Sequence, residues 1–211
     1  MSSSYKLYRE SALNNILSIR EGASSYFSQH IDNVGGNFGI DGNTFRAYRN
    51  YPIFPSLVYK NWIDENDILK NYAERFNLLN SLSSFKSIHS ELCADLTEYW
   101  IKCQKEGLTI SQKFKIIDLF VKFNSRIKVN GYDQLNNNLC KYGNIPLDSY
   151  SLRAISLNFY GIVISQRPGM GDIKDELTYN FLQDQINELM IDLQLPNLYF
   201  DYYAWNAPHI Q

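Results

Sequence analysis

The sequence predicts an all-α protein, or one very nearly so, and three observations support this. Apolar residues recur at three- and four-residue spacings through most of the 211 residues. No segment sustains the strict alternation of a half-buried strand, and no internal repeat is present. The chain is 45% apolar, which is enough to bury a sizeable core. We therefore expect a compact multi-helix bundle over residues 1–211, a single globular unit built either as one body or as two helical lobes with a cleft between them.

The apolar spacing places each helix in turn. Helices are expected over 11–29, 64–82, 84–106, 132–142, 149–159 and 175–193, with another opening at 109. The short apolar runs 162–164 and 198–200 are either short strands or parts of other elements.

Particular residues predict where these helices begin and end. Gly22 is expected to interrupt the first helix and Gly107 to end the third. Thr109–Gln112 has the form of a capping box and opens the next helix. Asp64-Glu65 and Asp175-Glu176 are interpreted as helix starts, where acidic side chains favour the helix dipole.

An aromatic segment runs from Thr44 to Trp62, where rings alternate with cations and two prolines interrupt the chain. Alternating rings and cations are typical of surfaces that stack single-stranded or flipped nucleotides. Most rings, however, simply pack in a protein interior. The segment is therefore either a nucleotide-stacking surface or an irregular stretch packed under the helices.

Cysteine and histidine usage argues against bound metal. Cys93, Cys103 and Cys140 are odd in number and have no paired spacing, so neither a disulfide framework nor a zinc site is expected. The three histidines, His30, His89 and His209, lack partners at metal-ligand spacing and are interpreted as capping or surface residues. No stretch approaches the roughly 20 apolar residues that span a bilayer. We expect a soluble, cytoplasmic, monomeric protein with no metal, no cofactor and no membrane partner.

The charges are unevenly distributed although the formal net charge is only −2. Residues 102–128 hold seven basic and two acidic side chains, whereas residues 171–211 hold seven acidic and one basic. On the helix that opens at Thr109, the side chains of Lys115, Lys122 and Arg126 share one face. This basic stripe is either an ordinary solvated face or a surface for phosphates.

A lysine and a carboxylate flank a short turn between residues 140 and 153. Pro146 favours an extended approach, and Asp148 can cap the helix that begins at Ser149 by accepting a backbone N–H. A carboxylate that is fixed in position in this way can act as a catalytic group. Asp148 is therefore either a helix cap alone or a catalytic group, and Lys141 is either a surface charge or its partner.

This region resembles the helix-hairpin-helix DNA glycosylase superfamily, including glycosylase-like proteins of bacteria and phages. The resemblance rests on Lys141, then Ile145-Pro146-Leu147-Asp148, then the helix sequence 149–155, and it is strongest over 127–155. The ending Asp201–Asn206 is similar to the end of small phage-associated proteins of this type. The resemblance implies double-stranded DNA with a modified or damaged base as partner and cleavage of its N-glycosidic bond after base flipping.

The resemblance also implies residue roles. Asp148 would stabilise positive charge on the sugar and orient water. Lys141 would attack the anomeric carbon in a lyase step or contact phosphate. The implied base-contacting residues are Tyr142, Tyr202, Tyr203 and Trp205, and the implied DNA-backbone contacts are Lys115, Lys122, Arg126, Lys128 and Gly143. Two alternatives remain: a non-catalytic DNA-binding protein of the same fold, and a helical phage or mobile-element protein-interaction module.

Overall fold

The computed structural model describes residues 3–29, 40 and 42–207, and these residues form helices and connecting segments without a strand. The all-α prediction is confirmed. The helices are α1 (Ser3–Leu17), α2 (Arg20–Ser28), η1 (Thr44–Tyr48), α3 (Pro55–Glu65), α4 (Ile68–Asn77), α5 (Leu82–Gln104), α6 (Ile110–Asn124), α7 (Leu135–Tyr142), α8 (Ser149–Asn158), η2 (Met170–Asp172), α9 (Glu176–Asp192) and α10 (Tyr199–Asn206).

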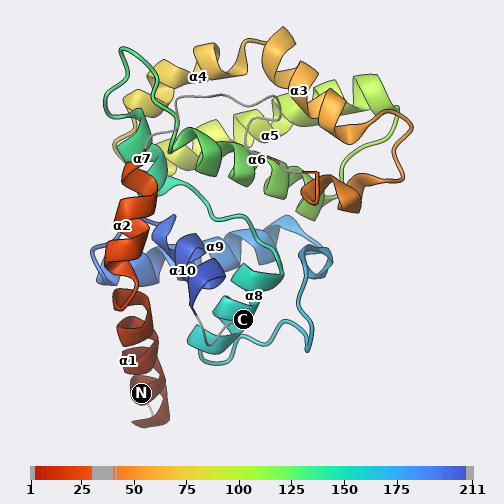
Figure 1. Cartoon of the computed structure of the whole chain (residues 1–211). Coiled ribbons are helices and arrows are strands. Elements are labelled where there is room, and N and C mark those ends of the chain that lie inside the picture. Colours follow the sequence, from red (N-terminus) through yellow and green to blue (C-terminus); the bar gives the residue numbers. More distant parts are fainter. Residues whose placement is uncertain (1–2, 30–39, 41, 208–211) are drawn as a thin grey trace.

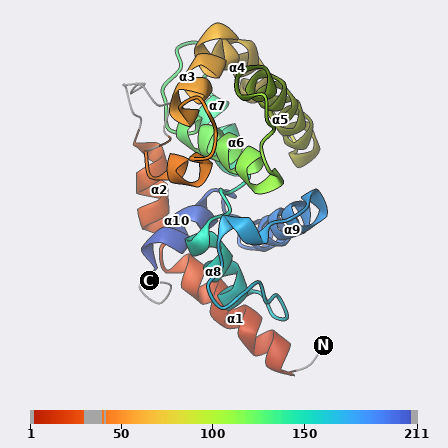
Figure 2. The ribbon, with the colours of Figure 1, turned by 90° about the vertical axis from the view of Figure 1, so that its right-hand side faces the viewer.

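The helices form two groups (Figure 1). The upper group holds α3 to α7, and the lower group holds α8, α9 and α10. The N-terminal helices join the lower group, since α1 packs against α8 and α2 packs against α10; in Figure 2, α1 runs below α8 and α2 lies beside α10. The connecting segment 143–148 leads from α7 in the upper group to α8 in the lower. One apolar core is continuous through both groups, from Trp62 and Trp100 to Phe200.

Helix starts agree with their local sequence signals. Thr109 and Gln112 form the predicted capping box of α6, in which the Thr109 hydroxyl accepts a hydrogen bond from the Gln112 N–H. The Asp175 carboxylate caps α9 by accepting from the Thr178 N–H. Both predictions are confirmed because capping is decided within one turn of the chain.

Two predicted helix ends were wrong. The first helix breaks after Leu17 and not at Gly22, which lies inside α2 and leaves room for the Tyr202 ring of α10. The third ends at Gln104 and not at Gly107, because Lys105 adopts the left-handed conformation (φ 62°) and its N–H donates to the Ile101 carbonyl.

The range 64–82 is not one helix. Asp64 and Glu65 end α3, and α4 begins after Asp67, whose φ is 46°. The interpretation of Asp64-Glu65 as a helix start was therefore wrong. Of the two short apolar runs, 162–164 has no regular structure and 198–200 leads into α10.

Most rings of the aromatic segment 44–62 pack in the interior. Phe45, Tyr48, Tyr59 and Trp62 are all buried in the core of the upper group, and the Tyr48 hydroxyl donates to the Gln112 carbonyl of α6. The packing interpretation holds for these four rings. Phe54, by contrast, is 80% exposed.

Gly143, at the end of α7, is a position where a side chain has no space. A Cβ atom there would lie 2.4 Å from the Leu139 carbonyl oxygen and 2.8 Å from Val121. We expect Gly143→Ala to lower the free energy of unfolding by about 1–3 kcal/mol, as overpacking of a core does. Urea unfolding measures this, with Gly169→Ala as the control because a Cβ at Gly169 meets nothing within 4 Å. Equal stabilities of the two variants would contradict the close packing.

Candidate functional site

A row of ionic and aromatic pairs lies where α6 of the upper group faces α2, α8 and α10. It joins cations of α6 to carboxylates and rings on the other helices, and we call it the junction strip. Its members are Lys115 and Lys122 of α6, Arg126 just after α6, Tyr26 of α2, Asp148 and Tyr150 at the start of α8, and Asp201, Tyr202 and Trp205 of α10. Most of the residues that the sequence singled out therefore share one surface.

Asp148 is the N-cap of α8, as predicted, and its carboxylate is fixed by the helix. Oδ1 accepts the N–H groups of Tyr150 (3.0 Å) and Ser151 (3.1 Å), and the Asp148 N–H donates to Ser151 Oγ (2.7 Å). Oδ2 faces Lys115, whose Nζ lies 3.7 Å away. Both side chains are 13% exposed. One oxygen is therefore held by the backbone, while the other is turned towards a cation, and the side chain as a whole keeps a small exposed fraction.

Asp201 and Lys122 form a buried ion pair beside Asp148. Lys122 Nζ lies 2.5 Å from Asp201 Oδ2, and the Asp201 side chain is 1% exposed. Burial raises the pKa of Asp201, although the charge of Lys122 acts against this. Burial also opposes the charge of Lys122, but Asp201 outweighs it and raises the pKa of the ammonium. Neither Asp201 oxygen accepts a hydrogen bond of good geometry from the described residues, so this carboxylate depends on the Lys122 charge.

Arg126, two residues after the end of α6, is the third cation of the strip. Its guanidinium lies 3.7 Å above the Tyr26 ring, and Nε donates to the Tyr26 carbonyl at 3.2 Å. The basic stripe is thus neither a solvated face nor an open phosphate surface, since its three cations contact the helices opposite. The helical spacing correctly placed them on one face but carried no information on what lies across from it.

The strip ends in a pair of exposed rings next to Asp148. The rings of Tyr150 and Trp205 lie 4.2 Å apart between centroids at an interplanar angle of 33°. Their exposed fractions are 36% and 42%. An exposed aromatic surface two residues from a fixed carboxylate is suited to stacking an unpaired base.

Lys141 and Tyr142 do not belong to the strip. Lys141 is exposed, its ammonium lies 4.9 Å above the Tyr142 ring, and both residues line another cavity whose walls do not include Asp148. Lys128 is an exposed residue in the turn after α6. The structure therefore does not place Lys141 beside the Asp148 carboxylate.

Two predicted contact residues are buried, and these predictions were wrong. Gly143 is buried and its N–H donates to the Leu139 carbonyl at 2.8 Å, so this amide is not available to a phosphate. Tyr203 lies wholly in the core, where its hydroxyl donates to Asn158 Oδ1. Tyr202 is partly buried against Tyr26, with ring centroids 5.5 Å apart. Residue type alone did not separate core rings from surface rings.

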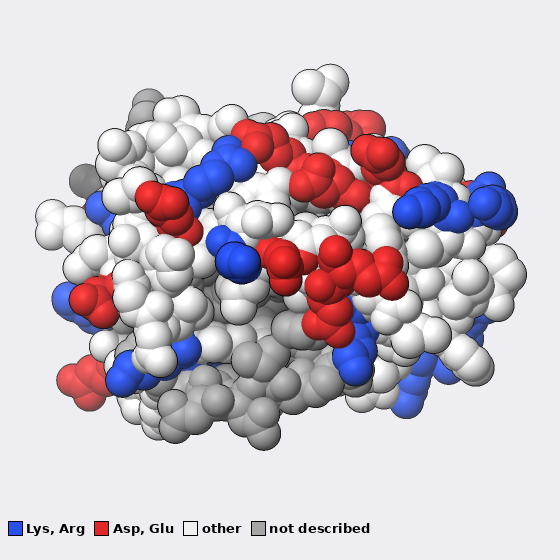
Figure 3. Space-filling model, turned by 90° about the horizontal axis from the view of Figure 1, so that it is seen from above, with Lys and Arg blue, Asp and Glu red and all other residues white. Residues whose placement is uncertain are grey.

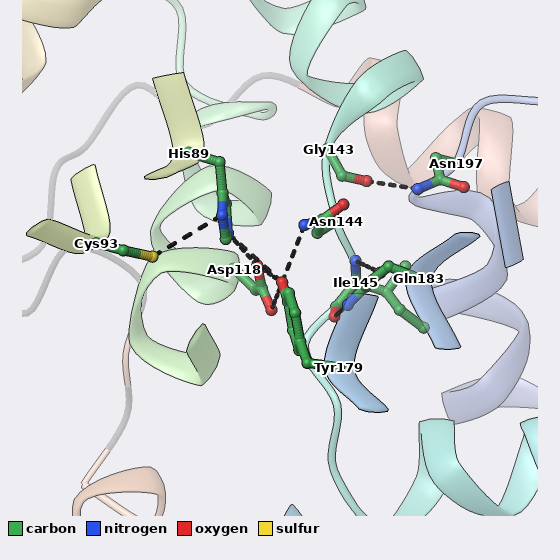
Figure 4. A network of polar contacts seen from close by, with 9 residues as sticks. All are labelled: His89, Cys93, Asp118, Gly143, Asn144, Ile145, Tyr179, Gln183 and Asn197. Carbon is green, nitrogen blue, oxygen red and sulfur yellow. Dashed lines mark hydrogen bonds and ion pairs between the residues drawn. The ribbon is translucent and has the colours of Figure 1, made fainter. Parts of the chain in front are cut away.

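The connecting segment that leads to Asp148 is held by hydrogen bonds from α9 and from Asn197, two residues before α10 (Figure 4). The Ile145 N–H donates to Gln183 Oε1 (3.1 Å), and Gln183 Nε2 donates back to the Ile145 carbonyl (2.8 Å). Asn197 Nδ2 donates to the Gly143 carbonyl (2.8 Å). These contacts fix the backbone three residues before Asp148. Nothing in the local sequence marked Gln183 or Asn197 for this role.

The same segment connects to a buried polar network around His89 (Figure 4). His89 Nε2 lies 2.8 Å from Asp118 Oδ1, the Tyr179 hydroxyl donates to Asp118, and Asn144 Nδ2 donates to the Tyr179 oxygen (2.9 Å). His89 is 4% exposed. Its interpretation as a capping or surface residue was therefore wrong, while His30 and His209 lie outside the described residues. The partner, Asp118, is 29 residues away in the chain and was not identifiable by spacing.

The His89 network makes stability depend on pH. Burial acts to lower the pKa of His89, but the hydrogen bond to Asp118 and the contact with Cys93 outweigh it and raise the pKa to about 10. A raised folded-state pKa stabilises the protein below the unfolded value of about 6.5, and this contribution is lost as pH rises towards 10. We expect the melting temperature to fall between pH 6.5 and 9.

The pH effect is checked by thermal unfolding at constant ionic strength. The variant His89→Gln should melt at a lower temperature with a flatter profile over the same range. A wild-type melting temperature that is constant from pH 6.5 to 9 would contradict a charged His89.

Comparisons with protein-family models, with curated proteins and with solved structures find no match to this chain. Across residues 3–29, 40 and 42–207, no three His, Cys, Asp or Glu side chains converge as metal ligands would. None of the helices in that part of the chain is long and apolar enough to cross a bilayer. Function therefore has to be argued from the geometry of the junction strip.

Proposed function

We propose that the protein is a DNA glycosylase-like enzyme that hydrolyses the N-glycosidic bond of a modified base flipped out of a duplex. The observation that carries this proposal is that the two oxygens of the Asp148 carboxylate lie in different environments. Oδ1 is held by two backbone N–H groups of α8, and Oδ2 is turned towards α6 and accepts no hydrogen bond from the described residues. A carboxylate with one anchored and one available oxygen is suited to stabilising a developing cation.

The chemistry requires a negative group beside the sugar. As the bond from the anomeric carbon to the base nitrogen breaks, the electron pair leaves with the base and positive charge develops on the sugar. Asp148 Oδ2 would stabilise that charge and accept a proton from the attacking water. Lys115, at 3.7 Å, is too far for a strong hydrogen bond to Asp148 and would exchange this contact for a DNA phosphate.

The ring pair supports base flipping. Removing a base from the stack costs a few kcal/mol, and stacking on an aromatic side chain recovers about 1–3 kcal/mol per base. Tyr150 and Trp205 offer such a surface next to Asp148. By contrast, the face seen from above in Figure 3 carries acidic side chains among its basic ones and is poorly suited to a phosphate backbone.

Base release from defined duplexes tests the proposal. The protein is incubated at low salt with duplexes that carry unmodified, oxidised, deaminated, alkylated or hypermodified bases, and abasic sites are measured. We expect release from at least one modified duplex and no borohydride-trapped adduct, because Lys141 lines a cavity whose walls do not include Asp148. A trapped adduct that persists in Asp148→Asn and disappears in Lys141→Met would overturn the assignment of Asp148.

Two other outcomes identify the alternatives. Salt-sensitive duplex binding without base release would support a non-catalytic DNA-binding protein, in which the contact between Lys115 and Asp148 persists. Absence of duplex binding at low salt would support a helical protein-interaction module.

A further inference from the structure

A cavity of about 880 Å³ lies between α2, α7, α9 and the segment that leads into α10. Its walls include no residue of the junction strip. The volume is typical of pockets that enclose a small organic molecule. This cavity is therefore a candidate binding site that the proposed base release does not use.

The polar part of the wall consists mainly of amide side chains. Five of them line the cavity: Asn136, Asn137, Asn187, Gln194 and Asn197. An amide donates and accepts hydrogen bonds at once, so a group of amides suits a ligand whose edge carries both kinds of group. Among the described lining residues, Lys141 carries the only charge. The site thus favours a ligand with a single anionic group.

Asn197 supplies a buried acceptor that has no partner. The residue is 1% exposed, its N–H donates to the Lys141 carbonyl and its Nδ2 donates to the Gly143 carbonyl. Oδ1 is turned away from Gly143 in Figure 4 and accepts no hydrogen bond within the described residues. This oxygen is also closed off from the cavity, so a ligand can meet only the more open amides of Asn137, Asn187 and Gln194.

The remaining walls are aromatic and apolar. Phe27 and Tyr199 both line the cavity as a stacked pair, with ring centroids 5.7 Å apart and an interplanar angle of 8°. Apolar and aromatic walls with a few converging polar groups are typical of sites for planar heteroaromatic ligands.

We propose that this cavity binds a nucleoside monophosphate. The base lies against the aromatic and apolar walls, its polar edge meets the amides of Asn187 and Gln194, and the phosphate is held by Lys141. A fatty carboxylate satisfies the lysine but leaves these amides without a partner, and inorganic phosphate leaves the apolar walls uncovered.

Calorimetric titration of the full chain tests this. The probes are AMP, GMP, CMP and UMP, their nucleosides, inorganic phosphate and decanoate. We expect micromolar binding of at least one monophosphate, about tenfold weaker binding of its nucleoside, and no binding of phosphate or decanoate. Lack of binding of all four monophosphates at millimolar concentration, or binding of decanoate alone, overturns the proposal.

Matched variants locate the site. Lys141→Met should weaken the monophosphate about tenfold and leave the nucleoside unchanged, whereas Lys60→Met, at an exposed position of α3, should change neither. Ile191→Trp adds bulk to the cavity wall and should weaken both ligands, unlike Leu177→Trp at an exposed position of the same helix. Unchanged affinities in both cavity variants would place any bound nucleotide elsewhere. Base release is not a readout, so this test is independent of the Asp148 proposal.

Discussion

Asp148→Asn is expected to lower base release by at least about 100-fold, the scale seen when one electrostatic contact to a transition state is removed. The amide oxygen can still accept the N–H groups of Tyr150 and Ser151, and asparagine caps a helix about as well as aspartate. The charge that would stabilise the sugar cation is lost, while the local structure stays. The measurement is the single-turnover rate of abasic-site formation on the best duplex of the panel.

Asp175→Asn is the matched control for this variant. Asp175 also caps a helix, by accepting the Thr178 N–H at the start of α9, and it lies outside the junction strip. It should release bases at the wild-type rate and melt close to Asp148→Asn. If both variants retain full activity, Asp148 is a cap and nothing more.

Lys122→Met is expected to lower the free energy of unfolding by about 3–5 kcal/mol, because it leaves the buried Asp201 carboxylate without its cation. The effect should be greatest at neutral pH, where Asp201 must be charged or take up a proton at a cost. Urea unfolding at pH 7 measures it. The double variant Lys122→Met with Asp201→Asn should recover part of the loss, since no buried charge remains.

A surface pair gives the scale for comparison. Lys86 and Asp184 lie 2.6 Å apart, but both side chains are more than 40% exposed, and such pairs contribute about 0–1 kcal/mol. Lys86→Met should therefore have a small effect. Equal losses in Lys86→Met and Lys122→Met would show that the Lys122 pair is not desolvated in solution.

The features that could be predicted from sequence are those decided within a turn or two of helix. The Asp148 cap, the box at Thr109 and the cap at Asp175 each depend on residues three apart in the chain. The apolar repeat of α9 likewise follows from the helical period.

The partners of the site residues could not be predicted, because they lie far away in the chain. Lys122 pairs with Asp201, 79 positions away. A cation of the basic stretch 102–128 and a carboxylate of the acidic stretch 171–211 therefore meet inside the protein, between α6 and α10. Similarly, Gln183 binds the Ile145 backbone from α9, 38 positions away. Such partners are set by how helices pack, and a single sequence does not specify them. The same reason explains why Tyr203 was mistaken for a surface ring.

The anchored approach to Asp148 has a consequence for how a duplex would be accommodated. Backbone groups of Gly143 and Ile145 are tied to Asn197 and Gln183, so the stretch joining the two sets of helices has little freedom to swing. Because this segment of the protein is rigid, the DNA would have to change shape when it binds. The double helix would have to kink towards the protein, and sequences or lesions that soften it would be favoured before any chemical step.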